Sequence, residues 1–281
     1  MPTSAPEWRK TLHLIQQLSL PKGRTALGLF TLEGYRSMER ALRNAAPLEA
    51  VLVGADFLER PNQRRQNIVD AVTARGIPLH VAPEDALVPL TQGRGLGNVF
   101  AVLRQPPEPD ITLLLSDADP ALIVVGWQLG DPGNTGAVIR SALAAGARAF
   151  LAVGTTDPWH PKAVRTSMGS LFALPVIRVQ DDAAWIDMLH AQQVETFATV
   201  CRDAEPLPSV TPSGQRVGLV MGSEAFGLPD AVAGQLRRRV TIPMPPGVDS
   251  YSINAATAVL AYTLMQQMEK QSTNLDVSGS L

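Results

Sequence analysis

Apolar and polar positions follow two different periods along the chain, and the changes between them predict alternating helices and strands. Residues 7–19 carry apolar side chains at helical spacing, and Pro21 ends that pattern. The run Ala121–Trp127 is apolar throughout, which is typical of a strand that is buried on both faces. Between and after these two segments the periods alternate, which predicts an α/β fold class.

The same patterns give the bounds of the expected elements. In the N-terminal part, we expect helices at 33–44, 64–75 and 84–90, and strands at 26–31, 50–53, 78–81 and 99–103. In the C-terminal part, we expect strands at 121–127, 149–153, 175–179, 195–200, 216–221 and 240–242, and helices at 136–145, 161–168, 182–192, 229–235 and 254–267. This order indicates a small α/β domain followed by a larger one.

Prolines mark the boundary between these domains. The stretch Gln105–Asp110 is rich in proline, which fixes φ and removes hydrogen-bond donors, so it cannot continue a central strand. Leu113–Leu115 could still pack as a connecting strand. The expected organisation is a helical extension (1–23), a small domain (24–106), a linker (107–119), a larger domain (120–271) and a polar, flexible tail (272–281).

Composition narrows the class of protein. Hydrophobic residues make up 45% of the chain and charged residues 18%, which is typical of a globular protein. No apolar run reaches the ~18 residues of a membrane-spanning helix, and the N-terminus lacks the apolar region of a signal peptide. Cys201 is the single cysteine, expected as a buried residue at a strand end, and the four histidines are scattered. We therefore expect a cytoplasmic protein without disulfides, metal or membrane contact.

Charge is distributed unevenly between the two parts of the chain. Residues 1–106 hold 13 Lys and Arg against 9 Asp and Glu, whereas residues 107–281 hold 11 against 17. The excess of basic residues in the N-terminal third is consistent with an RNA-docking surface there. Ordinary solvated helix faces would explain it equally well.

Three loops carry the candidate chemistry, and each follows a predicted strand. They are Asp131–Gly136 with Arg140 one turn later, Met221–Gly227, and Ile242–Asn254. Ligands of open α/β sheets bind at the carboxyl ends of strands, so we expect the loops to converge on one site. An arginine in an apolar helix, such as Arg140, must meet an anion because its guanidinium stays charged.

Glycines and polar side chains in these loops suit a small ligand. Asn134 or Thr135 is a good helix N-cap, and Gly222 and Gly227 allow a turn with exposed amides. Glu224 lies between these glycines, at a position where a carboxylate usually has a partner. Downstream of the second expected strand of the larger domain, Lys162 and Arg165 share one helix face, where they could contact phosphates or simply be solvated.

Taken together, the loops resemble the three motifs of the SpoU/TrmH family of SPOUT RNA ribose 2'-O-methyltransferases. Asn134, Gly136 and Arg140 match its Asn-x-Gly-x-x-x-Arg pattern, and Gly222, Glu224, Gly227 and Leu228 match its Gly-x-Glu-x-x-Gly-Leu pattern. Phe30–Tyr35 and Gly97–Val102 resemble the family's ribosomal-protein-like substrate-binding domain more weakly. The third motif departs from the family pattern after Ile242, Pro243 and Met244, which fit. Without a gap, Ser252 stands at the family's asparagine and Asn254 at its following serine, so the two residue types are exchanged. With a two-residue shift, Ser252, Ile253 and Asn254 match the family's Ser-Leu-Asn.

The resemblance implies a mostly parallel sheet with a trefoil knot and a homodimer that transfers methyl groups from S-adenosylmethionine to ribose 2'-hydroxyls of rRNA or tRNA. It implies Arg140 as the essential residue, oriented by Asn134 and Glu224, with Ser252 and Asn254 fixing the loop and the ribose. The implied cofactor residues are Gly222, Ile242, Met244, Ser250, Tyr251 and Ile253, and the implied RNA contacts are Lys162 and Arg165. The altered third motif leaves open a non-catalytic RNA-binding protein with a degenerate SPOUT fold.

Overall fold

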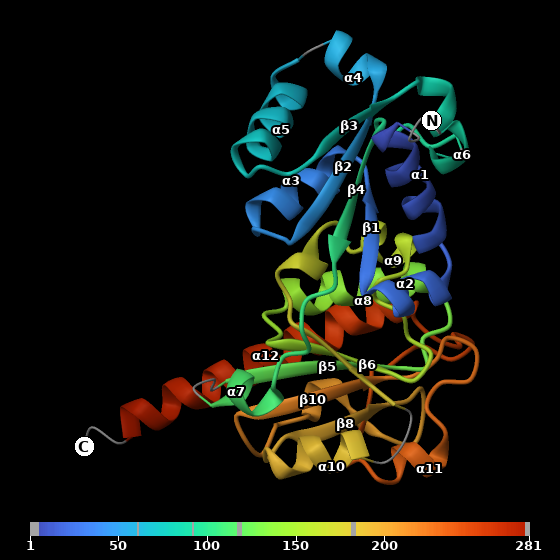
Figure 1. Cartoon of the computed structure of the whole chain (residues 1–281). Helices are drawn as coiled ribbons and strands as arrows, with labels where there is room; N and C mark the ends of the chain where they lie inside the picture. The colour runs from blue at the N-terminus through green and yellow to red at the C-terminus, as the bar shows by residue number, and fades with distance from the viewer. Residues whose placement is uncertain (1–5, 61, 92, 117–119, 181–183, 279–281) are drawn as a thin grey trace. The chain divides into compact units, whose positions relative to one another are not determined.

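The computed structural model describes residues 6–60, 62–91, 93–116, 120–180 and 184–278 (Figure 1). By its internal contacts the chain divides into two compact units. Unit 1 comprises Met1–Pro107 and Trp159–Phe172, and unit 2 comprises Glu108–Pro158 and Ala173–Leu281. Each unit has a sheet of its own with helices packed on it, so the predicted α/β fold class is confirmed. The trefoil knot stays a prediction.

Unit 1 is built on a four-stranded sheet in the order β1-β4-β2-β3. Its strands are β1 (Leu29–Glu33), β2 (Leu48–Gly54), β3 (Leu79–Ala82) and β4 (Val99–Arg104), and its helices include α1 (Glu7–Leu18), α2 (Pro21–Leu27), α3 (Tyr35–Arg43), α4 (Ala55–Glu59), α5 (Gln63–Ala74) and α6 (Glu84–Thr91). β4 pairs antiparallel with β1 and β2, whereas β2 pairs parallel with β3. The apolar face of α1 buries Ile15 and Leu18 in one cluster with Leu52 and Phe100 of the sheet.

Unit 2 contains a seven-stranded sheet in the order β7-β6-β5-β10-β8-β11-β9, and the pairings among its described residues are all parallel. Its strands are β5 (Ala121–Trp127), β6 (Ala149–Val153), β7 (Val176–Val179), β8 (Glu195–Thr199), β9 (Glu205–Pro206), β10 (Arg216–Met221) and β11 (Arg238–Thr241). Its helices are α7 (Ile111–Leu115), α8 (Pro132–Ala144), α10 (Ala184–Ala191), α11 (Asp230–Ala233) and α12 (Ile253–Ser278), with the 3₁₀ turn η2 (Leu207–Ser209).

Helices cover both faces of this parallel sheet. α8 and α12 lie against each other and against β5, while α10 lies on the opposite face (Figure 1). On the α10 side, Ile123 and Val125 of β5 share a core cluster with Trp185 and Leu189. Burial on both faces explains why β5 reads as a continuous apolar run rather than as an alternation.

A segment from the C-terminal half of the sequence completes unit 1. It contains α9 (Pro161–Thr166) and the 3₁₀ turn η1 (Ser170–Phe172). The Phe30 ring of β1 lies with its centroid 4.8 Å from that of Trp159 and 6.4 Å from that of Phe172. Through these aromatic contacts the segment packs with β1 in unit 1. The sequence analysis had instead assigned it to one domain with the rest of 120–271.

Two short helices, one at each end of the expected small domain, differ from the sequence expectation. α2 occupies Pro21–Leu27, so β1 begins only at Leu29; proline is well suited to a first helical turn, where its missing amide costs nothing. Within the expected linker, Ile111–Leu115 forms α7 instead of a strand, because the Asp110 carboxylate accepts a hydrogen bond from the Thr112 amide at 2.8 Å and caps the helix. Linker residues 117–119 lie outside the described residues.

The C-terminal helix is longer than its apolar pattern indicated. α12 runs from Ile253 to Ser278, beyond the expected end at 267; the flexibility of the tail stays a prediction, and residues 279–281 lie outside the described residues. Gln271 donates a hydrogen bond to the Pro212 carbonyl at 2.8 Å, and Ser272 donates to Gln215 at 2.8 Å. These tertiary contacts anchor the start of the polar continuation. Among the described helices, none is both long and apolar enough to cross a bilayer.

Candidate active site

The first of the three loops ends in α8, which begins earlier than the sequence indicated. Asp131 accepts a hydrogen bond from the Gly133 amide at 2.7 Å, and Pro132 follows as the first helical residue. Asp131, and not Asn134 or Thr135, is therefore the N-cap of α8. Asn134 lies in the first turn, where its side chain reaches out of the helix rather than back to its amides.

Asn134 and Glu224 join the first loop to the second. The Asn134 side-chain amide donates to Glu224 Oε1 at 2.8 Å, and the Gly130 amide approaches Glu224 Oε2 at 3.3 Å. The two loops leave neighbouring strands, because β5 and β10 pair in parallel with Met221 opposite Gly126. Glu224 thus has the partners that its position predicted.

The second loop is a tight turn closed by its own backbone. Ser223 and Gly227 exchange two backbone hydrogen bonds, of 3.1 and 2.8 Å, and Gly227 has a φ of 66° that favours glycine. A Cβ atom on Gly222 would lie 2.4 Å from the Gly227 carbonyl carbon, so only glycine fits there. The turn presents Glu224 outward together with Phe226, whose residue surface is 89% exposed.

The third loop has no regular structure, as its prolines predicted, and it leads into α12. Ser252 Oγ lies 3.4 Å from the Ala255 amide nitrogen at the start of that helix. One residue into the helix, Asn254 Oδ1 accepts a hydrogen bond from Ser141 Oγ of α8 at 2.7 Å. Ser252 therefore serves the start of α12, while Asn254 ties the third loop to α8.

All three loops line one hollow of about 660 Å³. Of the residues expected to hold a cofactor, Gly222, Ser250, Tyr251 and Ile253 line it. A second, narrower hollow of about 90 Å³ shares Ser250 and Tyr251 and is lined also by Ile242 and Met244. The structure thus gathers the six expected cofactor residues around two hollows with a common wall.

Arg140 lies apart from these hollows. Its side chain is exposed and makes no hydrogen bond or ion pair with any residue that the structure describes. Asn134 and Glu224 bond to each other and make no described hydrogen bond or ion pair with Arg140, so the orientation of Arg140 by this pair stays a prediction. Its chain neighbour Ser141 makes the contact to Asn254, so Arg140 stands beside the junction of α8 and the third loop.

Lys162 and Arg165 lie on α9 and belong to unit 1, whereas the three loops belong to unit 2. His160 caps α9 by accepting the Lys162 amide hydrogen bond on Nδ1 at 3.0 Å. Arg165 Nη1 lies 3.7 Å from the Glu33 carboxylate of β1. The phosphate-contact role of both side chains stays a prediction about unit 1.

Sequence reasoning missed several residues around the site. Cys201 was expected to be buried, but it is exposed and lines both hollows, because β8 lies between β10 and β11 in the sheet. Trp127 and Phe226 line a further hollow of about 770 Å³ that also includes Asn134 and Glu224. The sequence held a signal only for Phe226, an aromatic residue in a polar turn. No group of three or more His, Cys, Asp or Glu residues within the described ranges is placed to hold a metal.

Comparison with known proteins agrees with this architecture. Residues 121–262 match the SpoU rRNA Methylase family. The chain is 27% identical over 259 residues to the 23S rRNA (guanosine(2553)-2'-O)-methyltransferase of Bacillus subtilis, covering 92% of this chain and 94% of that one. It is 28% identical to the 23S rRNA (guanosine-2'-O-)-methyltransferase of Acinetobacter baylyi, with coverage of 93% and 98%. The crystal structure of an AdoMet-bound rRNA methyltransferase from Sinorhizobium meliloti matches with a TM-score of 0.78 and 25% identity, covering 91% of this chain and 94% of that one. The resemblance of the three loops is thereby confirmed, and the chain belongs to the SpoU rRNA methylase family.

Proposed function

We propose that this protein transfers a methyl group from S-adenosylmethionine to a ribose 2'-hydroxyl of RNA. The observation that carries the proposal is the convergence of all three family loops on one hollow, with Asn134 and Glu224 joined at 2.8 Å. The similar proteins from Bacillus subtilis and Acinetobacter baylyi are named as 23S rRNA methyltransferases, which makes ribosomal RNA the first substrate to test.

The two hollows fit the proposed cofactor. The narrow one has apolar walls that include Val240, Ile242 and Leu260, which suit the flat adenine base. The wider one offers the backbone of the Gly222–Gly227 turn and the hydroxyls of Ser250 and Ser252, which suit a ribose or a carboxylate. When bound, S-adenosylmethionine supplies an electrophilic methyl group on a sulfonium.

The chain's own task is to align the ribose and to stabilise its oxygen as the proton leaves. Alignment of reactants can supply ~7–11 kcal/mol of a reaction barrier. A guanidinium is a poor base, so Arg140 acts as a clamp that holds the adjacent phosphate and lowers the pKa of the 2'-hydroxyl, while the proton passes to that phosphate or to water. The Asn134–Glu224 pair and the Asn254–Ser141 contact hold the surrounding loops.

The test is a methylation assay with full-length protein, radiolabelled S-adenosylmethionine and unmodified 23S rRNA or tRNA transcripts. We expect label at one ribose, which mapping of 2'-O-methyl positions would locate. Calorimetry should show cofactor binding in the absence of RNA. RNA binding without cofactor binding would instead support the non-catalytic alternative.

We expect Phe226→Ala to raise the KM for RNA roughly tenfold with little change in kcat, because base–aromatic stacking contributes ~1–3 kcal/mol per base. Phe226 is 89% exposed and lines the hollow that contains Asn134 and Glu224, where a nucleotide next to the target would lie. Steady-state kinetics with varied RNA would measure the effect. Phe226→Tyr, which keeps the ring, should retain the wild-type KM; an unchanged KM in the alanine variant would rule out stacking.

We expect the protein to be a homodimer. α12 buries Leu260 and Leu264 but leaves Tyr262 61% and Val259 41% exposed, an apolar strip that a second copy could cover. Sedimentation should therefore give about twice the 30.0 kDa chain mass. Replacing Val259 and Tyr262 together by serine should weaken the dimer, whereas Leu113→Ser, at an exposed apolar site of α7, should not. A wild-type monomer at micromolar concentration would contradict this.

A further inference from the structure

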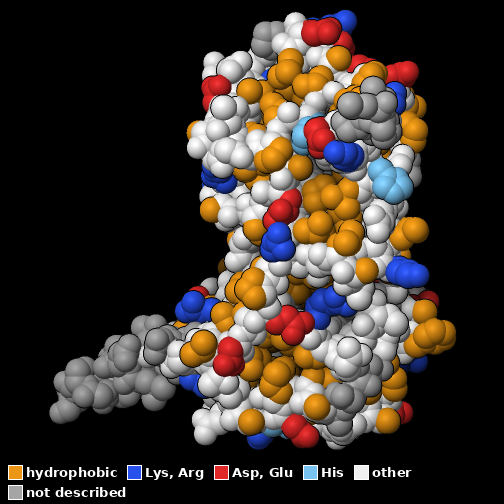
Figure 2. Space-filling model, in the orientation of Figure 1, with side chains coloured by type: hydrophobic (Ala, Val, Ile, Leu, Met, Phe, Trp, Pro, Cys, Tyr) orange, Lys and Arg blue, Asp and Glu red, His pale blue; other side chains and the backbone are white. Residues whose placement is uncertain are grey.

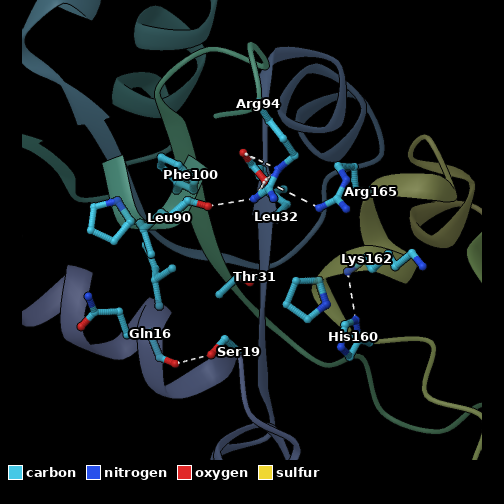
Figure 3. Close-up of a pocket in the computed structure, with 14 residues that line it drawn as sticks. Gln16, Ser19, Thr31, Leu32, Leu90, Arg94, Phe100, His160, Lys162 and Arg165 are labelled. Atoms are coloured by element: carbon cyan, nitrogen blue, oxygen red, sulfur yellow. Dashed lines mark hydrogen bonds and ion pairs between the residues drawn. The ribbon is translucent and has the colours of Figure 1, made fainter. Parts of the chain in front are cut away.

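Unit 1 contains a hollow of about 460 Å³ that shares no residue with the three loops (Figure 3). Its walls come from α1, β1, β4, the end of α6 and the segment that carries α9. The volume lies within the range of small-molecule pockets. Nothing in the proposed reaction accounts for this hollow.

Positive charge exceeds negative charge within this hollow. Arg94 donates two hydrogen bonds to Glu33 Oε2, at 3.1 and 2.9 Å, and Arg165 approaches the same oxygen at 3.7 Å. Figure 3 shows Arg94 and Arg165 entering from different sides of the hollow. The Glu33 side chain is only 11% exposed, so one sheltered carboxylate serves two guanidiniums.

The surplus charge belongs mainly to Arg165. Burial lowers the pKa of Arg165, and Arg94 lowers it further, whereas Glu33 raises it. A guanidinium remains protonated under such conditions, so two positive charges share the single carboxylate of Glu33, and the Arg165 contact is the longer of the two, at 3.7 Å against 2.9 Å. Planar guanidiniums in this situation favour an anion with several oxygens, of which phosphate is the most common.

The rest of the hollow suits the other parts of a nucleotide. Pro89 and Leu90 at the end of α6 give it an apolar wall beside Arg94, which donates a hydrogen bond to the Leu90 carbonyl at 2.8 Å. Lys162 lines the hollow, but its side chain is exposed and extends away from Arg94 and Arg165 (Figure 3). If the phosphate at Arg165 belongs to a single-stranded RNA, the RNA backbone would pass Lys162 as it leaves the hollow.

The charge of unit 1 agrees with a polyanionic ligand. By sequence, unit 1 holds 15 Lys and Arg against 9 Asp and Glu, whereas unit 2 holds 9 against 17. On the face shown in Figure 2, basic and acidic side chains are interspersed and form no single basic patch. On this face, binding of a polyanion would therefore depend on local contacts and not on one basic patch.

We propose that this hollow binds one nucleotide of the RNA substrate, with its phosphate on Arg165 and its base or ribose against Pro89 and Leu90. The proposal rests on the proposed function. Because the methylated ribose must reach the loops of unit 2, the nucleotide held here is a different one of the same RNA. The hollow would therefore help to choose which nucleotide is methylated.

The test compares full-length Arg165→Gln with Arg43→Gln, which removes the same charge from an exposed position of α3 outside the hollow. Filter binding of a short single-stranded RNA of mixed sequence is measured over a series of salt concentrations. Arg165→Gln should weaken binding about tenfold and make the plot of log K against log salt shallower by about 0.7, the value for one neutralised phosphate of a single strand. Arg43→Gln should change neither quantity measurably.

A second variant keeps the result interpretable if Arg165→Gln folds poorly. Arg165→Lys retains the charge, so it should keep the wild-type salt slope while losing part of the affinity. If Arg165→Gln, shown to be folded by its melting temperature, binds RNA as Arg43→Gln does, the proposal is wrong. Calorimetry that shows micromolar binding of inorganic phosphate, lost in Arg165→Gln while the affinity for RNA is unchanged, would also overturn the assignment to RNA.

The kinetic readout separates this proposal from the proposed function. With unmodified 23S rRNA, Arg165→Gln should raise the KM for RNA far more than it alters kcat. If wild-type protein methylates RNA and the KM of Arg165→Gln equals that of Arg43→Gln, only the inference about the hollow fails. If wild-type protein methylates no RNA but the salt slopes differ as expected, the reaction is wrong and the RNA site stands.

Discussion

Arg140→Ala is expected to lower the turnover number for RNA methylation by about 100-fold or more, while the affinity for S-adenosylmethionine changes only a few-fold. Arg140 lines neither hollow that would hold the cofactor, so its loss leaves those walls intact. Its side chain is exposed and has no partner among the described residues, so its guanidinium is available to bind the phosphate and ribose of the RNA. An interaction made mainly in the transition state appears in kcat.

Single-turnover kinetics and calorimetry measure the two quantities for Arg140→Ala. Arg140→Lys should restore little activity, because an ammonium cannot reproduce the planar two-pronged contact of a guanidinium. Arg148→Ala removes an exposed arginine just beyond the same helix and should behave as wild type. Wild-type turnover in the alanine variant, or complete loss of cofactor binding, would show that the assigned role is wrong.

Gly222→Ala is expected to lower kcat/KM by roughly 100-fold and to weaken cofactor binding in parallel. The added Cβ would lie 2.4 Å from the Gly227 carbonyl carbon and 2.5 Å from the Leu228 nitrogen. To reach ordinary contact distance the backbone must move by about 1 Å, and a displacement of that size at an active site can cost ~10²-fold. The same turn carries Glu224, so the displacement would also disturb its bond to Asn134.

The matched control for Gly222→Ala is Gly214→Ala, where an added Cβ would meet nothing within 4 Å. Overpacking should lower the free energy of unfolding of Gly222→Ala by about 1–3 kcal/mol, which denaturant titration would detect. Gly214→Ala should match wild type in both stability and catalysis. A Gly222→Ala protein with wild-type cofactor affinity would mean that the turn does not shape the cofactor site.

The sequence predicted most of the catalytic half of the fold because its strands are buried on both faces. β5 and β6 were predicted at their observed bounds, since continuous apolar runs leave little choice of period. Bounds set by side-chain capping were less accurate. Asp131 starts α8 several residues before the expected position, because capping depends on which side chain reaches the first amides.

The order of short motifs along the chain was enough to predict the family and the three loops that line one hollow, but not every residue around it. Glycines, prolines and a carboxylate at strand ends are local features, and each has a local physical reason to be there. The convergence of the three loops also followed from sequence, because parallel strands end at the same edge of a sheet.

Only the tertiary structure decided how these residues are paired. It bonded Glu224 to Asn134 and Asn254 to Ser141, left Arg140 without a described partner, and placed Cys201 at the site through the position of β8 in the sheet. It also showed that residues 159–172 pack with unit 1, where the Trp159 ring contacts the Phe30 ring. Such contacts join residues far apart in the chain and depend on packing between elements, which the local periodicity of a sequence does not encode.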